Sequence, residues 1–423
     1  MEDQSLIANL AQAALAAMRA GRMDEAAHTW DQILARAPEH AQALLYRGQI
    51  ALLRKDVAGA TALLERAAKA APREPAIALN MAFACRAAGN LAGEAENLER
   101  ALTLDPYFFP ALLAKGAMLE RAGHSRSAAQ VYRNTIKIAP PEERVPPDLR
   151  GALQHARQCV EADNAALSAH LEARVGPLRS GTDDVNLARF DECAGIAAGR
   201  KKVYTSDPVM LYYPRLPAIT YFEESLFPWL GGVEAATEII RAEFAAAAMA
   251  EGGEFSPYVN HPDSAPLNQW AELNRSPRWS AYFLWKDGVR QDAHCAQCPQ
   301  TARILETLPL LEIDGFAPTA FFSLLQPHTR IPPHTGSTNT RLTVHVPLIV
   351  PDGCAFRVGN DVREWRPGAA WVFDDTIEHE AWNNSDKPRA ILIFDVWNPL
   401  LSAAERELFA ALLIERRAYY AGG

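Results

Sequence analysis

A period of 34 residues constrains the fold of the first third of the chain more than any other feature. Four prolines keep this spacing, at Pro38, Pro72, Pro106 and Pro140. Twelve residues before them stand Ala26, Ala60, Glu94 and Ala128, and four residues further on stand Trp30, Leu64, Leu98 and Tyr132. Residues four apart share one face of a helix, and proline ends one helix before the next begins. The period therefore predicts repeated units, each a pair of short helices.

Small residues recur where the paired helices should meet. Gly48 and Gly116 lie 24 residues before their prolines, and Ala14 and Ala82 fill the equivalent positions. The period and this frame resemble tetratricopeptide repeats, as four units over residues 7–142 within a domain of residues 1–142. Such arrays form a superhelix whose concave face often holds peptides. The resemblance implies that the repeats hold a peptide or protein substrate; a spacer or a dimerisation surface is the alternative.

The pattern changes after the fourth repeat. Prolines at 140, 141, 146 and 147 interrupt it, and residues 148–175 again show apolar residues at helical spacing. We predict a capping helix followed by a linker near residues 176–184, together residues 143–185. Beyond them lies a second domain, residues 186–423.

The second domain is predicted to be rich in short strands. Residues 233–250 and 302–308 have helical patterns, whereas strands are predicted at 321–325, 342–350, 355–358, 370–373 and 389–397. Residues 359–361, Gly-Asn-Asp, suit a hairpin turn. Many short strands without intervening helices favour a sandwich or small barrel of the jelly-roll, cupin-like type. The predicted fold class is multidomain α + β, an all-α superhelix followed by this barrel.

Composition excludes several classes of function. The net charge is −9, which argues against a nucleic-acid partner. No run of about 18 apolar residues is present, so no membrane span is expected. The start of the chain lacks the features of a secretory signal, and six scattered cysteines do not form a disulfide framework. These features favour the cytoplasm.

Three residues of the last quarter suggest a metal centre. His334 lies in a loop rich in turn-forming residues, His379 lies between two predicted strands, and Arg389 begins an apolar strand. Two neutral imidazoles can hold a divalent metal, and a dicarboxylate that chelates this metal could meet the arginine with its far end. This combination fits Fe(II) and 2-oxoglutarate, although Fe(II) oxygenases usually add a carboxylate ligand.

The expected carboxylate is absent two residues after His334, where Gly336 stands. Asp374 or Asp375 could supply it, or a water could fill the place. Purely structural roles for these residues stay open. The histidines could be hydrogen-bonded parts of the fold, and Arg389 could form a salt bridge with Asp395 or Glu378.

The same region carries dense motifs: FSLL at 322–325, IPPHTG at 331–336, TNTRL at 338–342, FDD at 373–375, EHEAW at 378–382 and FDVW at 394–397. These motifs resemble the aspartyl/asparaginyl β-hydroxylase family. The resemblance is dense over residues 316–405 and extends more loosely back to about residue 205. Vertebrate members also join tetratricopeptide-like repeats to the oxygenase domain.

The resemblance implies a double-stranded β-helix oxygenase that uses Fe(II), 2-oxoglutarate and O₂. It assigns the metal to His334 and His379 without a protein carboxylate, so Gly336 matches the family pattern. Asp374 and Asp375 then orient His379 or face the substrate.

The resemblance also implies the 2-oxoglutarate contacts. Ser323 and Arg389 map to its distal carboxylate, His345 maps to the metal-chelating end, and Trp279 lines the pocket. Relatives often carry a basic residue where this chain has Thr343. Arg341 is therefore a candidate for the second group at the chelating end.

The implied reaction is hydroxylation of an unactivated C–H bond, at the β-carbon of Asp or Asn in a peptide or protein. A free amino acid, a lipid or another small molecule is the alternative substrate. A repeat scaffold with an inactive barrel is the alternative of another class.

Overall fold

The computed structural model describes residues 2–179, 187–249 and 255–421, which fall into two compact units, Met1–Arg200 and Lys201–Gly423. The second unit begins later than the sequence predicted. Helix α10 (Ala188–Ala197) belongs to the first unit because Asn164 donates to the Gly199 carbonyl and Arg200 donates to Ser168. Of the predicted linker, residues 176–179 form a 3₁₀ turn, and residues 180–184 lie outside the described residues.

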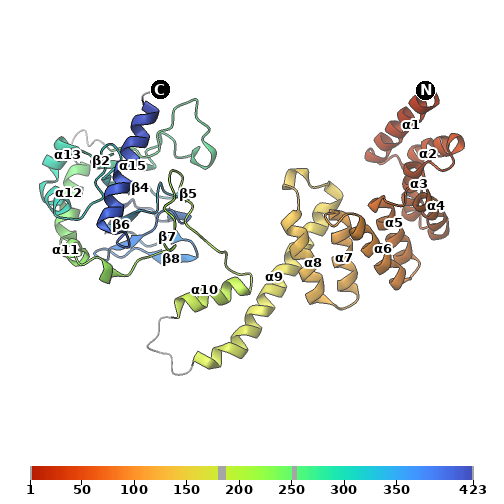
Figure 1. Ribbon diagram of the computed structural model, residues 1–423, viewed down its shortest axis with the longest axis horizontal. Helices are drawn as coiled ribbons and strands as arrows, with labels where there is room; N and C mark the ends of the chain where they lie inside the picture. Colours follow the sequence, from red (N-terminus) through yellow and green to blue (C-terminus); the bar gives the residue numbers. More distant parts are fainter. Residues whose placement is uncertain (1, 180–186, 250–254, 422–423) are drawn as a thin grey trace. The chain divides into compact units, whose positions relative to one another are not determined.

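The first unit confirms the four predicted helix pairs (Figure 1). These are α1 (Glu2–Arg19) with α2 (Met23–Arg36), α3 (Ala41–Leu53) with α4 (Val57–Ala70), α5 (Pro75–Ala87) with α6 (Leu91–Leu104), and α7 (Phe109–Arg121) with α8 (Ser125–Ile138). A long helix, α9 (Pro147–Val175), then packs on α7 and α8. Its buried residue Ala156 packs in one cluster with Leu113, Ala128 and Tyr132 of the last repeat.

The glycines of the repeats are needed for close packing. A Cβ atom on Gly116 would lie 2.1 Å from the ring of Tyr132, and one on Gly48 would lie 2.8 Å from the side chain of Leu64. The large residue of the second helix therefore fills the space that the glycine of the first helix leaves open.

Gly116→Ala should lower the free energy of unfolding by about 1–3 kcal/mol, because the aromatic ring must move from a well-packed core. Urea unfolding followed by circular dichroism would measure it. Gly151→Ala is the matched control, since Gly151 is exposed on α9 with no atom within 4 Å of a new Cβ. It should stabilise the helix by about 0.5–1 kcal/mol. Equal stability of the Gly116→Ala variant and the unmodified chain would contradict this packing.

The second unit is a barrel of two facing antiparallel sheets, which confirms the predicted jelly-roll class. The larger sheet has the order β1-β2-β4-β11-β6-β9, with β3 beside β2. Its strands are β1 (Ser256–Pro257), β2 (Trp279–Lys286), β3 (Val289–Arg290), β4 (Ala320–Leu325), β6 (Arg341–Ile349), β9 (Trp371–Phe373) and β11 (Arg389–Trp397). The smaller sheet has the order β5-β10-β7-β8, with β5 (Thr329–His334), β7 (Cys354–Val358), β8 (Asp361–Glu364) and β10 (His379–Asn383). The predicted turn at 359–361 joins β7 to β8.

Helices cover the outer face of the larger sheet (Figure 1). They are α11 (Leu230–Ala235), α12 (Thr237–Met249), α13 (Asp292–Gln297) and α14 (Pro299–Glu306). The single helix predicted over 233–250 is divided at Ala236, and the division lets Val233 and Ile240 reach the same core. The last helix, α15 (Ala403–Ala421), packs beside the barrel through Phe409 and Leu413.

The alternation of side chains gives each strand of the larger sheet two different faces. Phe322, Leu392 and Phe394 pack against the helices, whereas Ser323 and Ile391 face the other sheet. The barrel interior is therefore left to a separate set of residues, which line the candidate site.

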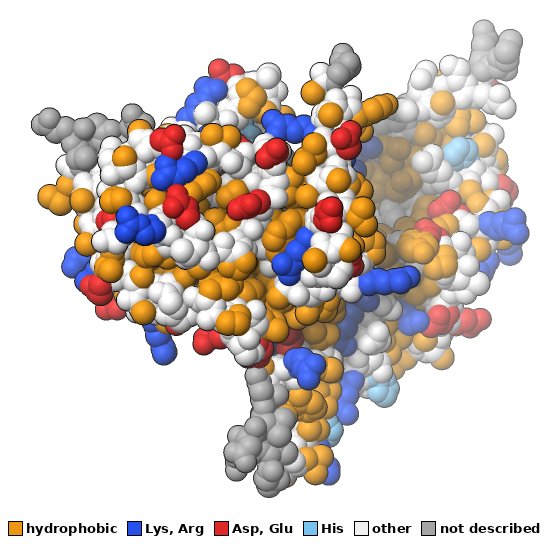
Figure 2. All heavy atoms as spheres, turned by 60° about the vertical axis from the view of Figure 1, so that its left-hand side comes forward, with side chains coloured by type: hydrophobic (Ala, Val, Ile, Leu, Met, Phe, Trp, Pro, Cys, Tyr) orange, Lys and Arg blue, Asp and Glu red, His pale blue; other side chains and the backbone are white. Residues whose placement is uncertain are grey.

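Two surface properties bear on partners. None of the described helices is both long and apolar enough to cross a bilayer. On the face shown in Figure 2, Lys and Arg side chains are scattered among Asp and Glu and do not gather into one broad basic surface.

Candidate active site

A pocket of about 860 Å³ opens between the two sheets. It is lined by every residue that the family resemblance assigns to the metal or the co-substrate: Trp279, Ser323, His334, Arg341, His345, His379 and Arg389. Thr343 and Asp375 also line it. The fold thus brings together residues as far apart in the chain as Trp279 and Arg389.

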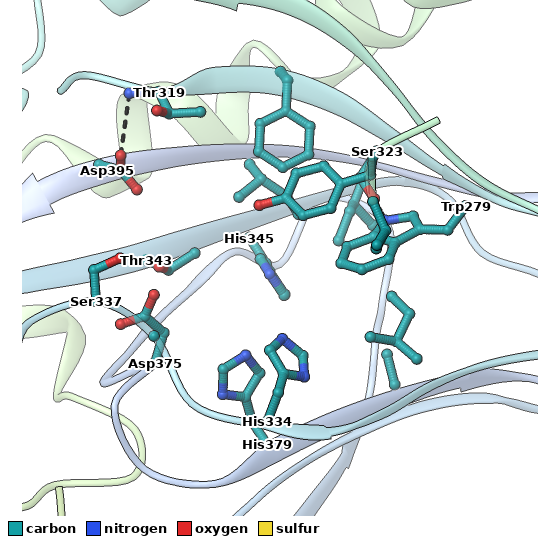
Figure 3. A pocket seen from close by; sticks show the side chains of 18 of the residues that line it. Trp279, Thr319, Ser323, His334, Ser337, Thr343, His345, Asp375, His379 and Asp395 are labelled. Atoms are coloured by element: carbon teal, nitrogen blue, oxygen red, sulfur yellow. Dashed lines mark hydrogen bonds between the residues drawn. The ribbon is translucent and has the colours of Figure 1, made fainter. Parts of the chain in front are cut away.

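His334 and His379 lie side by side at one end of the smaller sheet (Figure 3). They are cross-strand partners on β5 and β10, and their ring centroids are 4.1 Å apart. The Nδ1 of His334 lies 2.8 Å from the carbonyl oxygen of Pro332, and the Nδ1 of His379 lies 3.0 Å from that of Ile377. A carbonyl only accepts, so each Nδ1 carries the proton and each Nε2 keeps a free lone pair. This is the arrangement that metal-binding histidines usually have.

Both imidazoles are neutral at physiological pH. Burial lowers the pKa of His334 to about 3, with a further contribution from His379 beside it. Burial also lowers the pKa of His379 to about 4. A divalent cation would therefore meet two unprotonated nitrogens without displacing a proton.

Asp375 occupies the space beside Gly336. A Cβ on Gly336 would lie within 2.1 Å of the Asp375 carboxyl carbon, so an acidic side chain at residue 336 would not fit without displacing Asp375. The Oδ2 of Asp375 accepts from Arg341 at 2.6 Å, whereas its Oδ1 is buried without a hydrogen-bond partner among the described residues. One free carboxylate oxygen is therefore buried in the lining of the pocket.

Arg389 begins β11 on the pocket side and is only 1% exposed. It forms no ion pair with any described acid; Asp395 lies near Arg341 instead, and Glu378 pairs with Arg357. This excludes the two salt bridges that the sequence left open. Burial lowers the pKa of Arg389 to about 10. Its Nε has no partner in the described structure, and Nη1 reaches only the Ser323 hydroxyl, at 3.5 Å. A buried guanidinium with so few hydrogen-bond partners and no acidic partner among the described residues is suited to binding an anionic ligand.

Ser323 and Trp279 complete this end of the pocket. The indole Nε1 of Trp279 donates to the Ser323 hydroxyl at 3.1 Å. The hydroxyl, which is fully buried, is thereby oriented toward Arg389. In Figure 3, Ser323 and Asp375 lie on opposite sides of the histidines.

His345 lies on β6 between these two ends. Trp365 Nε1 donates to His345 Nδ1 at 3.4 Å, and burial together with Arg389 holds the pKa of His345 well below its usual range. The neutral ring therefore carries its proton on Nε2, where it can donate to an oxygen anion. Trp365 also stacks on Arg389, with the guanidinium carbon 4.8 Å from the ring centroid.

Arg341 is engaged by two carboxylates. It lies 2.6 Å from Asp375 and 3.6 Å from Asp395. Burial raises the pKa of Asp395 to about 6 despite this neighbour. The charge of Arg341 is therefore largely offset, which distinguishes it from Arg389. Asp374 is not in the pocket lining; its carboxylate accepts from Ser206 and Thr376.

Sequence reasoning missed the aromatic wall of the pocket, which is formed by Tyr258, Trp270, Phe283 and Phe321. Tyr258 stacks on Trp279 with ring centroids 4.1 Å apart, and Trp270 lies edge-on to His334 at 5.0 Å. Trp365 also lines the pocket. Tyr258, Trp270 and Trp365 belong to irregular or short segments, so periodicity gave no signal, and only their motif-rich partners drew attention to the site.

Comparison with known proteins follows the two units. A family model described as aspartyl/asparaginyl beta-hydroxylase matches residues 234–399, and a tetratricopeptide-repeat model matches residues 12–75. The chain is 37% identical over 142 residues to human aspartyl/asparaginyl beta-hydroxylase, covering 33% of this chain and 18% of that one.

Two further relatives match a longer part of the barrel unit. Ornithine lipid ester-linked acyl 2-hydroxylase of Rhizobium tropici is 32% identical over 202 residues, which cover 47% of this chain and 68% of that one. Human aspartate beta-hydroxylase domain-containing protein 2 is 29% identical over 205 residues, which cover 47% and 53%. The matched region is thus less than a fifth of the human hydroxylase and about two thirds of the bacterial relative.

Proposed function

The chain belongs to the aspartyl/asparaginyl β-hydroxylase family, and we propose that it is an Fe(II)- and 2-oxoglutarate-dependent dioxygenase that hydroxylates an unactivated C–H bond. The observation that carries this proposal is Arg389, a buried guanidinium without an acidic partner among the described residues, in a pocket that also holds two neutral histidines. An inactive barrel would gain nothing from a buried, unpaired cation, which is costly.

The residues of the pocket fit the two groups that this chemistry needs. His334 and His379 would hold Fe(II) through their free Nε2 atoms. Asp375 lines the same pocket and would accept a hydrogen bond from a water on the metal through its unpaired Oδ1. When bound, the iron with 2-oxoglutarate and O₂ supplies the oxidation: one oxygen atom enters the C–H bond, and the other leaves in succinate as CO₂ is released.

The protein's own part is to bind, orient and exclude water. Arg389 offers a planar fork for the distal carboxylate of 2-oxoglutarate, and Ser323 adds a hydroxyl beside it. His345 would donate from Nε2 to the carboxylate at the chelating end when 2-oxoglutarate is bound, and Arg341 is the second candidate there. Tyr258 and Trp270 would shield the reacting atoms from solvent.

The proposed substrate is an Asp or Asn residue of a peptide or protein, hydroxylated at its β-carbon and held by the repeats. This rests on the relation to human aspartyl/asparaginyl beta-hydroxylase and on the repeat unit. A lipid acyl chain is the second candidate, because the aromatic wall of Tyr258, Trp270, Phe283 and Phe321 offers an apolar surface and the Rhizobium relative is named for such a substrate.

Conversion of 2-oxoglutarate to succinate with Fe(II) tests the proposal, with Asp- and Asn-containing peptides or an ornithine lipid as the second substrate. Turnover that depends on Fe(II), with one oxygen atom gained by a peptide in mass spectrometry, is the expected result. Oxygen gained only by the lipid would transfer the proposal to the second candidate. No succinate under any of these conditions would refute the dioxygenase.

The repeats are tested with a fragment of residues 201–423, which begins at the second unit and keeps the hydrogen bonds of Lys202 with Asn360. It should retain Fe(II) and 2-oxoglutarate binding and basal turnover. Its activity on long peptides should fall more than its activity on short ones, because the superhelix no longer contributes binding. Equal activity of fragment and full chain on every peptide length would remove the repeats from substrate binding.

A further inference from the structure

A second group of metal-ligand side chains lies in the repeat unit, between α7 and α9. Glu120 is on α7, and His155 and Cys159 are one turn apart on α9. The His155 Nε2 lies 2.9 and 3.1 Å from the two carboxylate oxygens of Glu120. The Cys159 Sγ lies 3.1 Å from Glu120 Oε1 and 3.3 Å from His155 Nε2. A nitrogen, a sulfur and an oxygen thus converge on one point.

The spacing of these atoms is close to that of a tetrahedral zinc site. With Zn–S near 2.3 Å and Zn–N and Zn–O near 2.0–2.1 Å, neighbouring ligands lie roughly 3.3–3.6 Å apart. The observed separations, 2.9–3.3 Å, are shorter than these by about half an ångström at most. The side chain of His155 is 55% exposed. The imidazole can therefore rotate outward far enough to reach the zinc-site spacing, and an ion can enter from solvent.

The next shell of atoms also suits a metal. The Tyr132 hydroxyl donates to Glu120 Oε2 at 2.6 Å and thereby fixes the carboxylate. Such hydrogen bonds to ligands orient metal sites in general. The ring of Tyr132 in turn packs against Gly116, where the absence of a side chain leaves space for it. The position of Glu120 is therefore set by the packing of the last repeat.

The charges of the three side chains favour a binding site for a divalent ion over a reactive cysteine. Burial and the hydrogen bond to Glu120 raise the pKa of the Cys159 thiol to about 11, so the unmetallated side chain is a poor nucleophile. A carboxylate, a thiolate and a neutral imidazole carry two negative charges together, which a divalent cation balances.

We propose that Glu120, His155 and Cys159 bind Zn²⁺, with water as the fourth ligand, and that the ion fastens α9 to the last tetratricopeptide repeat. Binding releases the thiol proton to solvent, and the sulfur joins the metal as thiolate. The site uses no residue of the barrel pocket and does not depend on the proposed oxygenase reaction.

The test is a titration of the full chain, stripped of metal by a chelator, with Co²⁺ as a spectroscopic substitute for zinc. Thiolate ligation gives a sulfur-to-cobalt charge-transfer band, and a tetrahedral site gives intense visible bands. The barrel pocket cannot give the thiolate band, since no cysteine is among its described lining residues. One equivalent of Co²⁺ should develop the band, and Zn²⁺ should then abolish it.

Three variants and one control decide the ligands. Cys159→Ser should lose the thiolate band, and His155→Gln should weaken Co²⁺ binding by more than about 100-fold, since even an outer-shell change such as Tyr132→Phe costs about 10–100-fold. Cys85→Ser is the control, because Cys85 is another partly buried cysteine of the repeats. Circular dichroism checks that the helices remain. Absence of the band in the unmodified chain, or its persistence in Cys159→Ser, would overturn the proposal. If Cys159→Ser unfolds, the His155→Gln variant still tests the site, because His155 is exposed and its replacement should leave the fold intact.

Discussion

Replacing Arg389 with alanine should raise the Kd for 2-oxoglutarate by about 30-fold to several-thousand-fold, because loss of a buried charged partner costs about 2–5 kcal/mol. Fe(II) binding should survive, since backbone carbonyls position the two histidines and Arg389 contacts Ser323 and Trp365 instead. Arg389→Lys should have a smaller effect in the same direction, because lysine keeps the charge and loses the bidentate fork.

The measurement is an anaerobic titration of 2-oxoglutarate into the Fe(II)-loaded protein, followed through the metal-to-ligand charge-transfer band. Arg363→Lys is a suitable control, because this arginine on β8 is outside the pocket lining. Unchanged affinity in Arg389→Ala would mean that another residue holds the co-substrate. Arg341 would then be the first to examine, despite its pairing with Asp375.

His334→Ala and His379→Ala should each abolish turnover and Fe(II) binding while the barrel stays folded. Each variant leaves a single imidazole, which is too few protein ligands to retain Fe(II) at cellular concentrations. Metal analysis after gel filtration, together with the thermal unfolding curve, would separate loss of iron from loss of fold.

Asp374→Ala and Asp375→Ala are the comparison pair for these variants. Both should keep some iron, because Asp374 is tied to Ser206 and Thr376 and one oxygen of Asp375 is tied to Arg341. A folded Asp375→Ala protein without any iron would show instead that the free Oδ1 is a metal ligand and that the two-histidine description is wrong.

The helical unit was predictable because its information is local and repeated. A period of 34 residues fixes where each helix ends, and the small residue at Gly116 indicates where the neighbouring ring must fit. The barrel strands with alternating or wholly apolar patterns, such as β11, were also predictable. Strand β5 was not, because it contains Pro332 and Pro333, which are compatible with its place at the edge of a sheet but not with a strand pattern.

The residues of the candidate site also divide into those that the sequence could predict and those that it could not. His334, His379 and Arg389 stand in distinctive local sequence, and the chemistry of two imidazoles and a buried guanidinium connected them. Trp365 was missed as a site residue because its role depends on contacts with His345 and Arg389, which only the folded sheets create. The pairing of Arg341 with Asp375 and Asp395 is likewise a product of strand register, and no local pattern encodes it.

The cross-strand pairing of His334 with His379 has a consequence for how long the protein would retain the iron that we propose it binds. One proposed ligand, His379, lies on β10 inside the smaller sheet, and the other, His334, is the last residue of β5, the edge strand of that sheet. Edge strands open by local fraying far more often than a domain unfolds. The lifetime of iron bound as proposed would therefore be set by the detachment of one short strand and not by the stability of the barrel. Substrate or co-substrate that packs against β5 would slow this detachment, so iron bound as proposed should be lost fastest when the pocket holds neither of them.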